Sequence, residues 1–585
     1  MRQPFTLIAH SGIKRVLHPG QGERLFDAHT CADRRPLEVG CNAPLPARTI
    51  ADLFERAVDA VPDRLALVCG DRQLTFREFD DEANRLANHL LAQGFGHGDH
   101  IGIYGQNSAE WMIAMVAAFK IRAVPININF RYVEDELAYL FDNADLVALV
   151  ADREYLPRIE AVAGKVPGVR HIVVMEDGSD ADLAPLGAIS WTDAVAGASP
   201  DRPDLERSSD DRYVIYTGGT TGMPKGVVWR HEDVFYALGG GVDAYTNERV
   251  THGHQLAEKA AASATPMVAL QAPPLMHGAA QWGALRFLFE GNTICFIRRF
   301  SPEAVFDEIE RSRVSTLLIT GDAMARPLVE ALGAEPERWD LSSLFVLSSS
   351  AVTFSPSLKE QVLELLPDIM VVDAIGSSEG GMNGMVIQTR HETIAHGGGG
   401  PTVKAGLDAT VLDDDLRPVE PGSGVVGKLA RSGNIPVEYY KDPEKSAKTF
   451  LTDEAGVRWV VAGDFASLEA DGTITLLGRG SVCINSGGEK IFPEEVEAAL
   501  KSHPAVYDVL VVGVPDERWG QAVCAVVQPR PGETPTLESI AAHSRTQLAA
   551  YKTPRHLVLV DEIVRSPSGK PDYPWATKLA TQAVT

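Results

Sequence analysis

The segment from Tyr216 to Gly226, which reads Tyr-Thr-Gly-Gly-Thr-Thr-Gly-Met-Pro-Lys-Gly, has the residue types of a phosphate-binding loop. Glycines let a backbone approach an anion closely, threonine hydroxyls donate to phosphate oxygens, and a lysine adds positive charge. Because Gly226 follows Lys225, no hydroxyl stands where the GxxxxGK[ST] loop places one for magnesium. We therefore predict a phosphate cradle that is not a P-loop, and the alternative is a Gly/Thr hairpin without a ligand. The residues expected to hold phosphate are Thr217, Gly218, Gly219, Thr220, Thr221, Gly222 and Lys225.

Five more strings with polar or charged residues follow downstream. They are Gly376-Ser377-Ser378-Glu379, Gly463-Asp464, Gly478-Arg479, Ser486-Gly487-Gly488-Glu489-Lys490-Ile491-Phe492-Pro493 and Ser566-Pro567-Ser568-Gly569-Lys570. Taken singly, each string has an ordinary structural reading as a helix cap, a turn or a solvated charge. In this order, and together with the Gly/Thr loop, the strings resemble the motifs of the adenylate-forming superfamily, which includes acyl-CoA synthetases, nonribosomal peptide adenylation domains and luciferases. The resemblance covers about residues 47–577.

The resemblance implies a role for each matching residue in an ATP site. Ser378 lies by the nucleotide, and Glu379 helps to hold Mg²⁺, a hard cation that prefers oxygen ligands. Asp464 takes both ribose hydroxyls, and the planar fork of Arg479 meets phosphate or ribose oxygens. Lys570 contacts the acyl carboxylate and the α-phosphate during adenylation, so Lys570, Glu379 and Lys225 are the expected catalytic residues.

The resemblance also implies sites for CoA and for the acid. In acyl-CoA synthetases the loop at Ser486, Gly487 and Gly488 swings to the active site and lines the pantetheine tunnel, where glycines leave room for a thin chain. His277 stands where relatives place a histidine near the acyl carboxylate, and an ordinary buried histidine is the alternative.

Further stretches are similar to actinobacterial acyl-CoA synthetases that activate the C26 side-chain carboxylate of cholesterol-derived steroids. These stretches are 129–134, 140–143, 320–327, 478–482 and 569–573. The implied reaction runs from carboxylate to acyl-AMP to acyl-CoA, with ATP and CoA as substrates, Mg²⁺ as cofactor and a bulky lipophilic acid as the acyl donor. The alternatives are a long-chain or medium-chain fatty acyl-CoA ligase, an acyl-AMP ligase that loads a carrier protein, and a non-catalytic acyl-nucleotide binder.

The chain departs from the superfamily pattern at two places. At the hinge, Ser481 and Val482 stand where most relatives have an acidic or lysine residue and a second acid. Rotation is still expected there, because a small residue tolerates a change of backbone dihedral angles. Ile375 replaces an aromatic residue, so adenine is expected to pack on an aliphatic side chain.

The elements that must position these residues alternate in type. Strand-like runs such as Leu65–Cys69 and Met370–Val372 alternate with helical stretches such as Ile50 to Ala60. This alternation is typical of an α/β fold with largely parallel sheets covered on both faces. After about Val411, short strands and turns indicate a β-rich subdomain, and the end of the chain, including a helix from Pro493 to Lys501, reads as a small α+β domain. We predict an extension (1–46), a large AMP- and acyl-binding domain (47–478), a hinge (479–482) and a mobile lid (483–585).

Composition limits the partners and the compartment. The 585 residues include 79 Asp and Glu against 54 Lys and Arg, which gives a net charge of −25 and argues against a nucleic-acid partner. Residues 47–482 carry all of this excess, because the extension has a charge of +2 and the lid one of −2. Six scattered cysteines favour a reduced, cytoplasmic location, and no run is long and apolar enough to predict a transmembrane segment. Small molecules are the expected partners, and a homodimer stays open.

Overall fold

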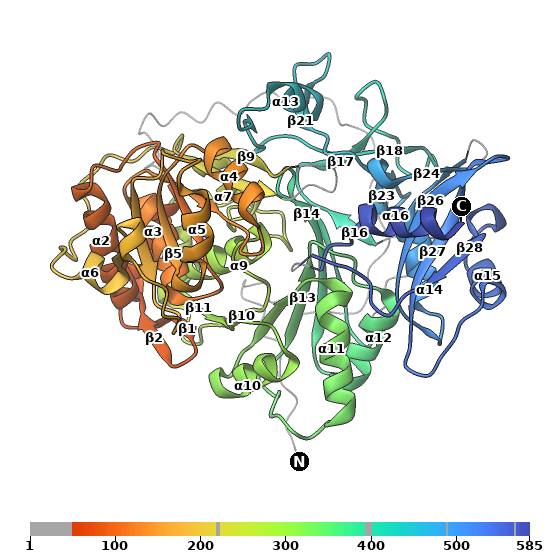
Figure 1. The fold of residues 1–585 in the computed structure, drawn as a ribbon, viewed down its shortest axis with the longest axis horizontal. Coiled ribbons are helices and arrows are strands. Elements are labelled where there is room, and N and C mark those ends of the chain that lie inside the picture. The colour runs from red at the N-terminus through yellow and green to blue at the C-terminus, as the bar shows by residue number, and fades with distance from the viewer. Residues whose placement is uncertain (1–48, 218–222, 392–400, 487–488, 567–568, 585) are drawn as a thin grey trace, which may run out of the picture. The chain divides into compact units, whose positions relative to one another are not determined.

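The computed structural model describes residues 49–217, 223–391, 401–486, 489–566 and 569–584 (Figure 1). The chain divides into two units, Met1–Leu45 and Pro46–Thr585, and all described residues belong to the second unit. Within them, no helix has the length and apolar character needed to cross a membrane. Four cysteines in this part, Cys69, Cys295, Cys483 and Cys524, are free thiols.

A five-stranded parallel sheet occupies the N-terminal part of the described chain, in the order β4-β3-β5-β6-β7. Its strands are β3 (His100–Tyr104), β4 (Val124–Asn127), β5 (Leu146–Asp152), β6 (His171–Met175) and β7 (Ile189–Ser190). Parallel neighbours need crossover connections. The helices here are α2 (Phe76–Ala92), α3 (Ala109–Lys120), α4 (Glu134–Asn143), α5 (Leu156–Ala163) and α6 (Trp191–Val195). Strand β3 is buried along its whole length, as expected for a covered parallel sheet.

The largest sheet changes from parallel to antiparallel along its width. Its first half is β2-β1-β11-β10-β12-β13-β14, in which only the β1–β2 pair is antiparallel. These strands are β1 (Leu65–Cys69), β2 (Arg72–Thr75), β10 (Val268–Gln271), β11 (Thr293–Phe296), β12 (Thr316–Ile319), β13 (Val346–Ser350) and β14 (Met370–Ser377). The helices of this part are α9 (Gly278–Phe289), α10 (Pro302–Ser312), α11 (Gly321–Ala334) and α12 (Pro356–Leu365).

The second half of the same sheet is antiparallel and forms the predicted β-rich part. Its strands are β15 (Gly381–Gln388), β16 (Thr402–Ala405), β17 (Ala409–Leu412), β18 (Val426–Arg431), β20 (Phe450–Thr452), β21 (Arg458–Val460), β22 (Asp464–Leu468) and β23 (Thr473–Arg479). This part begins earlier than predicted, since β14 continues beyond Val372 to Ser377 and pairs with β15. Glycine hides this pairing in the sequence: a Cβ at Gly376 of β14 would lie 2.6 Å from the Gly381 carbonyl oxygen of β15, so the close backbone approach requires a residue type that usually marks turns.

A three-stranded antiparallel sheet, β19-β9-β8, carries the ends of the predicted phosphate loop. Its strands are β8 (Arg212–Thr217), β9 (Lys225–Arg230) and β19 (Glu438–Tyr439). The short helices α7 (His231–Ala237), α8 (Gln255–Ala262) and α13 (Pro443–Thr449) complete the part before the predicted lid.

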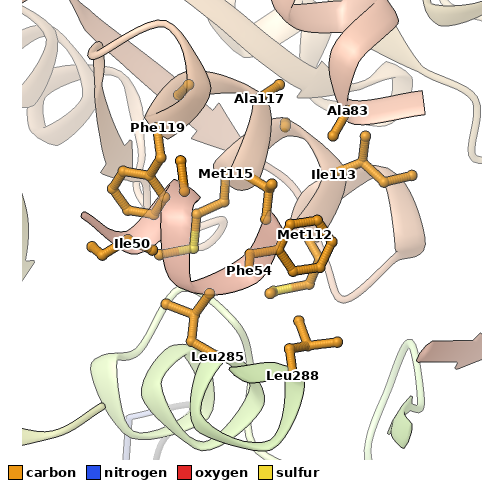
Figure 2. Packing of buried hydrophobic residues seen from close by; sticks show 14 of the residues in the cluster. Ile50, Phe54, Ala83, Met112, Ile113, Met115, Ala117, Phe119, Leu285 and Leu288 are labelled. Atoms are coloured by element: carbon orange, nitrogen blue, oxygen red, sulfur yellow. The ribbon is translucent and has the colours of Figure 1, made fainter. Parts of the chain in front are cut away.

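Helix α1 (Ile50–Ala60) lies in the main hydrophobic core, as Figure 2 shows. Its N-cap is Thr49, whose side chain accepts a hydrogen bond from the Asp52 N–H. Phe54 is fully buried and packs with Met115 of α3 and Leu285 of α9 in one cluster. Burial of this apolar face therefore joins the first helix to two helices that follow it far along the chain.

The lid segment, residues 483–585, is built around the long strands β26 and β27, which are blue in Figure 1. Alternate residues of β26 face two separate clusters: Val509 and Val511 belong to the cluster with Val496 of α14, and Leu510 to the one with Tyr573 of α16. A sheet covered by helices on both faces confirms the α+β character expected of this segment. Its elements are β24 (Ile484–Ser486), β25 (Glu489–Ile491), α14 (Pro493–Lys501), β26 (Val506–Asp516), β27 (Gly520–Pro529), α15 (Leu537–Arg545), β28 (His556–Leu559) and α16 (Tyr573–Val584).

Candidate active site

The two ends of the predicted phosphate loop face each other across a β-hairpin. Thr217 at the end of β8 pairs in register with Lys225 at the start of β9. The Lys225 ammonium forms an ion pair with Asp442, the N-cap residue of α13, and this contact lowers the pKa of Asp442. Five residues of the predicted loop, Gly218, Gly219, Thr220, Thr221 and Gly222, lie outside the described residues.

Ser378 and Glu379 lie in the turn between β14 and β15 and are held by two aromatic side chains. The Trp229 indole N–H donates to the Ser378 carbonyl oxygen at 2.9 Å. The Tyr439 hydroxyl donates to Glu379 Oε1, also at 2.9 Å. Because Tyr439 lies three residues before Asp442, one short segment contacts both Glu379 and Lys225.

Asp464 and Arg479 form an ion pair across neighbouring strands. They are register partners at the start of β22 and the end of β23, and Arg479 Nε lies 3.1 Å from Asp464 Oδ1. The negative charge of Asp464 raises the pKa of Arg479, although burial opposes this effect. Two residues that the resemblance assigns to the same ATP site are therefore in direct contact.

Lys570 reaches this group from the C-terminal part of the chain. Burial lowers the pKa of Lys570, the nearby Arg479 guanidinium acts in the same direction, and the carboxylates of Glu379 and Asp464 oppose both. The structure thus brings Lys570 into electrostatic range of three residues from other motifs. A buried cation in the field of two carboxylates can neutralise negative charge that develops on a bound substrate.

His277 also lies near Lys570. It is the N-cap residue of α9, and its Nε2 atom is buried without a hydrogen-bond partner among the described residues. Burial, followed by the charges of Lys570 and Arg131, lowers the pKa of His277 to about 3, so the ring is neutral at ordinary pH. A Cβ at Gly278 would lie 3.9 Å from Ser378 Oγ, which places the start of α9 beside the Ser378 turn. The unpartnered His277 Nε2 atom and the nearby Lys570 ammonium are suitable partners for the carboxylate of a substrate.

Ser486 does not join this group. It is buried at the end of β24, where it pairs with Glu489 of β25 and Gly520 of β27. Gly487 and Gly488 lie outside the described residues, so the predicted CoA loop stays a prediction. Ile375, predicted to pack against adenine, is buried with Val386 and Val403 in a core cluster.

Sequence reasoning missed three residues that hold the site together: Trp229, Tyr439 and Asp442. Asp442 followed by Pro443 is a helix-start signal that could have marked this segment. No local pattern marks Tyr439 or Trp229, because their partners are distant in sequence.

Comparison with known proteins identifies the family to which the chain is similar. The family model described as AMP-binding enzyme matches residues 54–440, and the model described as AMP-binding enzyme C-terminal domain matches residues 495–570. A Mycobacterium tuberculosis protein named medium/long-chain-fatty-acid–CoA/3-oxocholest-4-en-26-oate–CoA ligase is 53% identical over 530 residues, which cover 91% of this chain and 96% of that protein.

Two further proteins extend the comparison. A Rhodococcus rhodochrous protein named 3-oxocholest-4-en-26-oate–CoA ligase is 51% identical over 534 residues, covering 91% of this chain and 95% of that protein. The crystal structure of the anthranilate CoA ligase AuaEII in complex with anthranoyl-AMP has a TM-score of 0.79 at 24% identity, covering 93% of this chain and 99% of that one. At that identity, the structural likeness shows the fold.

Proposed function

The chain belongs to the family of AMP-binding enzymes and is an acid–thiol ligase, and we propose that it joins a bulky lipophilic carboxylic acid to CoA in two steps. In the first step the acid's carboxylate oxygen attacks the α-phosphorus of ATP, the bond to the β-phosphate oxygen breaks, and acyl-AMP and pyrophosphate form. In the second step the CoA thiolate attacks the acyl carbon, the bond to the AMP oxygen breaks, and AMP leaves; the thiol proton passes to solvent. The observation that carries the proposal is the position of Lys570 near Glu379, Asp464 and Arg479.

Each residue of the candidate site has a part in the first step. The Lys570 ammonium offsets the charge that develops on the attacking and bridging oxygens, while the neutral His277 ring offers a polar atom to the acid without adding a second cation. Asp464 accepts hydrogen bonds from the ribose hydroxyls, and Arg479 donates to ribose or phosphate oxygens. Lys225, Thr217 and the loop between them take the β- and γ-phosphates.

Glu379 fits the predicted role of magnesium ligand. One of its oxygens, Oε1, is fixed by the Tyr439 hydroxyl, and Oε2 takes no hydrogen bond within the described part of the chain. A carboxylate oriented in this way is a suitable ligand for a hard cation. When bound, Mg²⁺ would offset the charge of the ATP phosphates.

The acid is proposed from the names of the similar proteins. The proteins from Mycobacterium tuberculosis and Rhodococcus rhodochrous are both named for 3-oxocholest-4-en-26-oate, and the first is also named for medium- and long-chain fatty acids. A steroid side-chain acid is therefore the first candidate, and a medium- or long-chain fatty acid is the second. The cytoplasmic location and a homodimer stay proposals, which cell fractionation and light scattering test.

Product analysis across a panel of acids tests the reaction and the substrate class. The purified protein is incubated with Mg-ATP and a steroid side-chain acid, palmitate or octanoate, with and without CoA. We expect pyrophosphate release that depends on the acid, acyl-CoA only when CoA is present, and the steroid acid as the best substrate. A preference for palmitate would select the fatty-acid alternative, and acyl-AMP that does not react with CoA would exclude the second step.

Separate assays of the two steps test the role of Lys570. Lys570→Ala should reduce acid-dependent ATP–pyrophosphate exchange by at least about 100-fold, since it removes a cation that acts on the transition state. Thioester formation from preformed acyl-AMP should be largely retained. Lys578→Ala, a change at an exposed lysine of α16, is the matched control and should affect neither step. An equal loss of both steps in Lys570→Ala would remove this residue from its assigned role.

A further inference from the structure

A buried ion pair joins the lid segment to the start of α11. Lys501, the last residue of α14, places its Nζ 2.8 Å from Asp322 Oδ2, and the two side chains are only 3% and 6% exposed. The other Asp322 oxygen, Oδ1, accepts a hydrogen bond from the Ser355 N–H at 2.7 Å. Asp322 is thus fixed within the large region, and Lys501 reaches it from the lid.

Two more residues of the lid segment contact the same end of α11. The Arg326 guanidinium lies 4.9 Å from the centroid of the Tyr507 ring, within cation–π range. Gly569, with φ of +75°, lies so close to this helix that a Cβ would stand 2.6 Å from Ala323 Cβ. Since Gly569 directly precedes Lys570, the backbone that carries the proposed catalytic lysine rests on α11 beside the ion pair.

The chemistry of the pair makes it sensitive to separation. Two buried charges are stable only while they are paired with each other. Loss of one partner leaves an uncompensated buried charge, which is strongly destabilising. Lys501 also lies in the field of Glu497 and Asp508 within the lid segment, so it has a place in the lid itself. Asp322 belongs to the large region, and besides pairing with Lys501 its charge helps to raise the pKa of Arg565 in the lid segment.

We propose that Asp322 and Lys501 form a latch that holds the lid segment in the arrangement that presents Lys570 to the substrate. Both are positioning residues for the acyl-AMP step, because they act through the placement of Lys570 and touch no reacting atom. The inference rests on the proposed function and on the predicted rotation of the lid for the CoA step. The sequence stretch 320–327, which the site itself leaves without a role, becomes the docking surface for the lid.

The test uses variants that remove one charge at a time from the full-length protein. Asp322→Asn keeps an acceptor for Ser355 and removes the charge that faces Lys501. We expect ATP–pyrophosphate exchange to fall at least about tenfold, while CoA-dependent turnover of preformed acyl-AMP stays at the wild-type rate or rises. Lys501→Met should have the same effect, whereas Lys501→Arg keeps the positive charge and should retain much of the exchange activity. The double variant with Asp322→Asn and Lys501→Met should lose no more exchange activity than either single variant.

A second buried ion pair supplies the matched control. Lys359 and Asp373 lie 2.5 Å apart within the large region, with side chains 2% and 6% exposed. Asp373→Asn should lower both steps alike if it lowers them at all, because it only weakens the scaffold. Equal losses of both steps in Asp322→Asn, or no loss, would overturn the latch.

Hydrogen–deuterium exchange without substrates separates this inference from the proposed function. Asp322→Asn should raise exchange in peptides covering 320–326 and 501–508, and Asp373→Asn should not. Unchanged protection at both peptides would also overturn the latch. The proposed function would be overturned if the wild-type protein showed no acid-dependent pyrophosphate exchange. Even then, the hydrogen–deuterium exchange data would show whether Asp322 and Lys501 hold the lid segment on α11.

Discussion

At the scale of single residues, the candidate site depends on side chains outside the recognised motifs. Tyr439 is 4% exposed, and burial together with the Glu379 charge raises the pKa of its hydroxyl. The hydroxyl therefore remains protonated at ordinary pH and donates to Glu379 Oε1. The main-chain N–H of Tyr439 donates to Ser446 Oγ at 2.9 Å, which fixes the backbone that carries the ring. Tyr439 thus orients the carboxylate proposed to bind Mg²⁺.

Tyr439→Phe should weaken the use of Mg-ATP and leave the fold intact. The change removes one hydrogen bond to a charged group, worth about 1.5–3 kcal/mol, so kcat/KM for ATP should fall roughly tenfold or more. The Mg²⁺ concentration for half-maximal activity should rise as well. Steady-state kinetics at varied ATP and Mg²⁺ measure both effects.

The neighbouring residue is the control for this substitution. The Tyr440 hydroxyl donates to Asp145 at 2.7 Å, away from Glu379, so Tyr440→Phe should keep the wild-type dependence on both ligands. If Tyr439→Phe showed the same dependence on ATP and Mg²⁺ as Tyr440→Phe, the proposal that Tyr439 orients the Glu379 carboxylate would be wrong.

At the scale of elements, a buried lysine ties three N-terminal helices together. Lys120 ends α3 with no exposed side-chain surface, and its Nζ lies 2.5 Å from Glu55 of α1 and 2.7 Å from Asp80 of α2. Arg207 donates to both oxygens of Glu55, and Arg202 donates to Asp80. Each buried charge therefore has at least one partner of opposite sign.

Lys120→Met should lower the midpoint of unfolding. The change leaves two buried carboxylates with less compensation, which costs about 3–5 kcal/mol. Urea and thermal unfolding at pH 7 measure the shift. Lys165→Met, at a largely exposed ion pair with Asp135, should change the midpoint little. Similar midpoints for the two variants would mean that Lys120 does not tie the helices together.

The same cluster predicts how stability depends on acid. Burial by itself would raise the pKa of Glu55, but the hydrogen bond from Arg207 and the charge of Lys120 lower it to about 2. Because this value lies below the ordinary 4.5, the stabilisation is present above pH 4.5 and is lost as pH falls from 4.5 toward 2. In Glu55→Gln, the fall in the unfolding midpoint between pH 5 and pH 3 should be smaller than in the wild type, and an identical fall would contradict this assignment.

Local sequence signals predicted the bounds of single helices better than they predicted which strands pair. Helices α1 and α14 have the predicted bounds because each starts with a strong local signal, the Thr49 cap and Pro493. The extension of β14 to Ser377 could not be predicted, since its pairing depends on glycines that usually indicate turns. For the site, Asp464 and Lys570 are brought together by tertiary packing, so only the resemblance could predict their meeting.

At the scale of the whole molecule, Glu494 lies where the lid segment meets the end of β23. Its Oε1 accepts a hydrogen bond from the Arg479 N–H at 3.4 Å, and its Oε2 is buried with no hydrogen-bond donor among the described residues. Burial, followed by the charge of Glu497, raises the pKa of Glu494 to about 8. The ionisable groups that interact with Glu494 electrostatically are Glu497, Asp464, Arg479, Tyr573 and Cys483.

Glu494 should make the acyl-AMP step depend on pH. The proposed rotation of the lid about residues 479–482 would carry α14 away from Gly478, open Glu494 to water and return its pKa toward the ordinary 4.5. Between pH 4.5 and pH 8, Glu494 is protonated in the docked arrangement and ionised in the open one. Docking therefore weakens as pH rises toward 8, and above that pH it no longer changes. ATP–pyrophosphate exchange should therefore fall between pH 6 and 8, by at most about tenfold per unit.

Glu494→Gln isolates this effect, because glutamine keeps an acceptor for Arg479 and carries no charge at any pH. Its exchange rate should vary much less between pH 6 and 8 than that of the wild type. Lys570, whose own pKa is lowered by burial, is present in both proteins, so it does not account for the difference. CoA is absent from the assay, so ionisation of its thiol does not contribute. Glu517→Gln, at an exposed acid of the same segment, should keep the wild-type profile. An equally steep fall in Glu494→Gln would show that another group controls the docking of the lid.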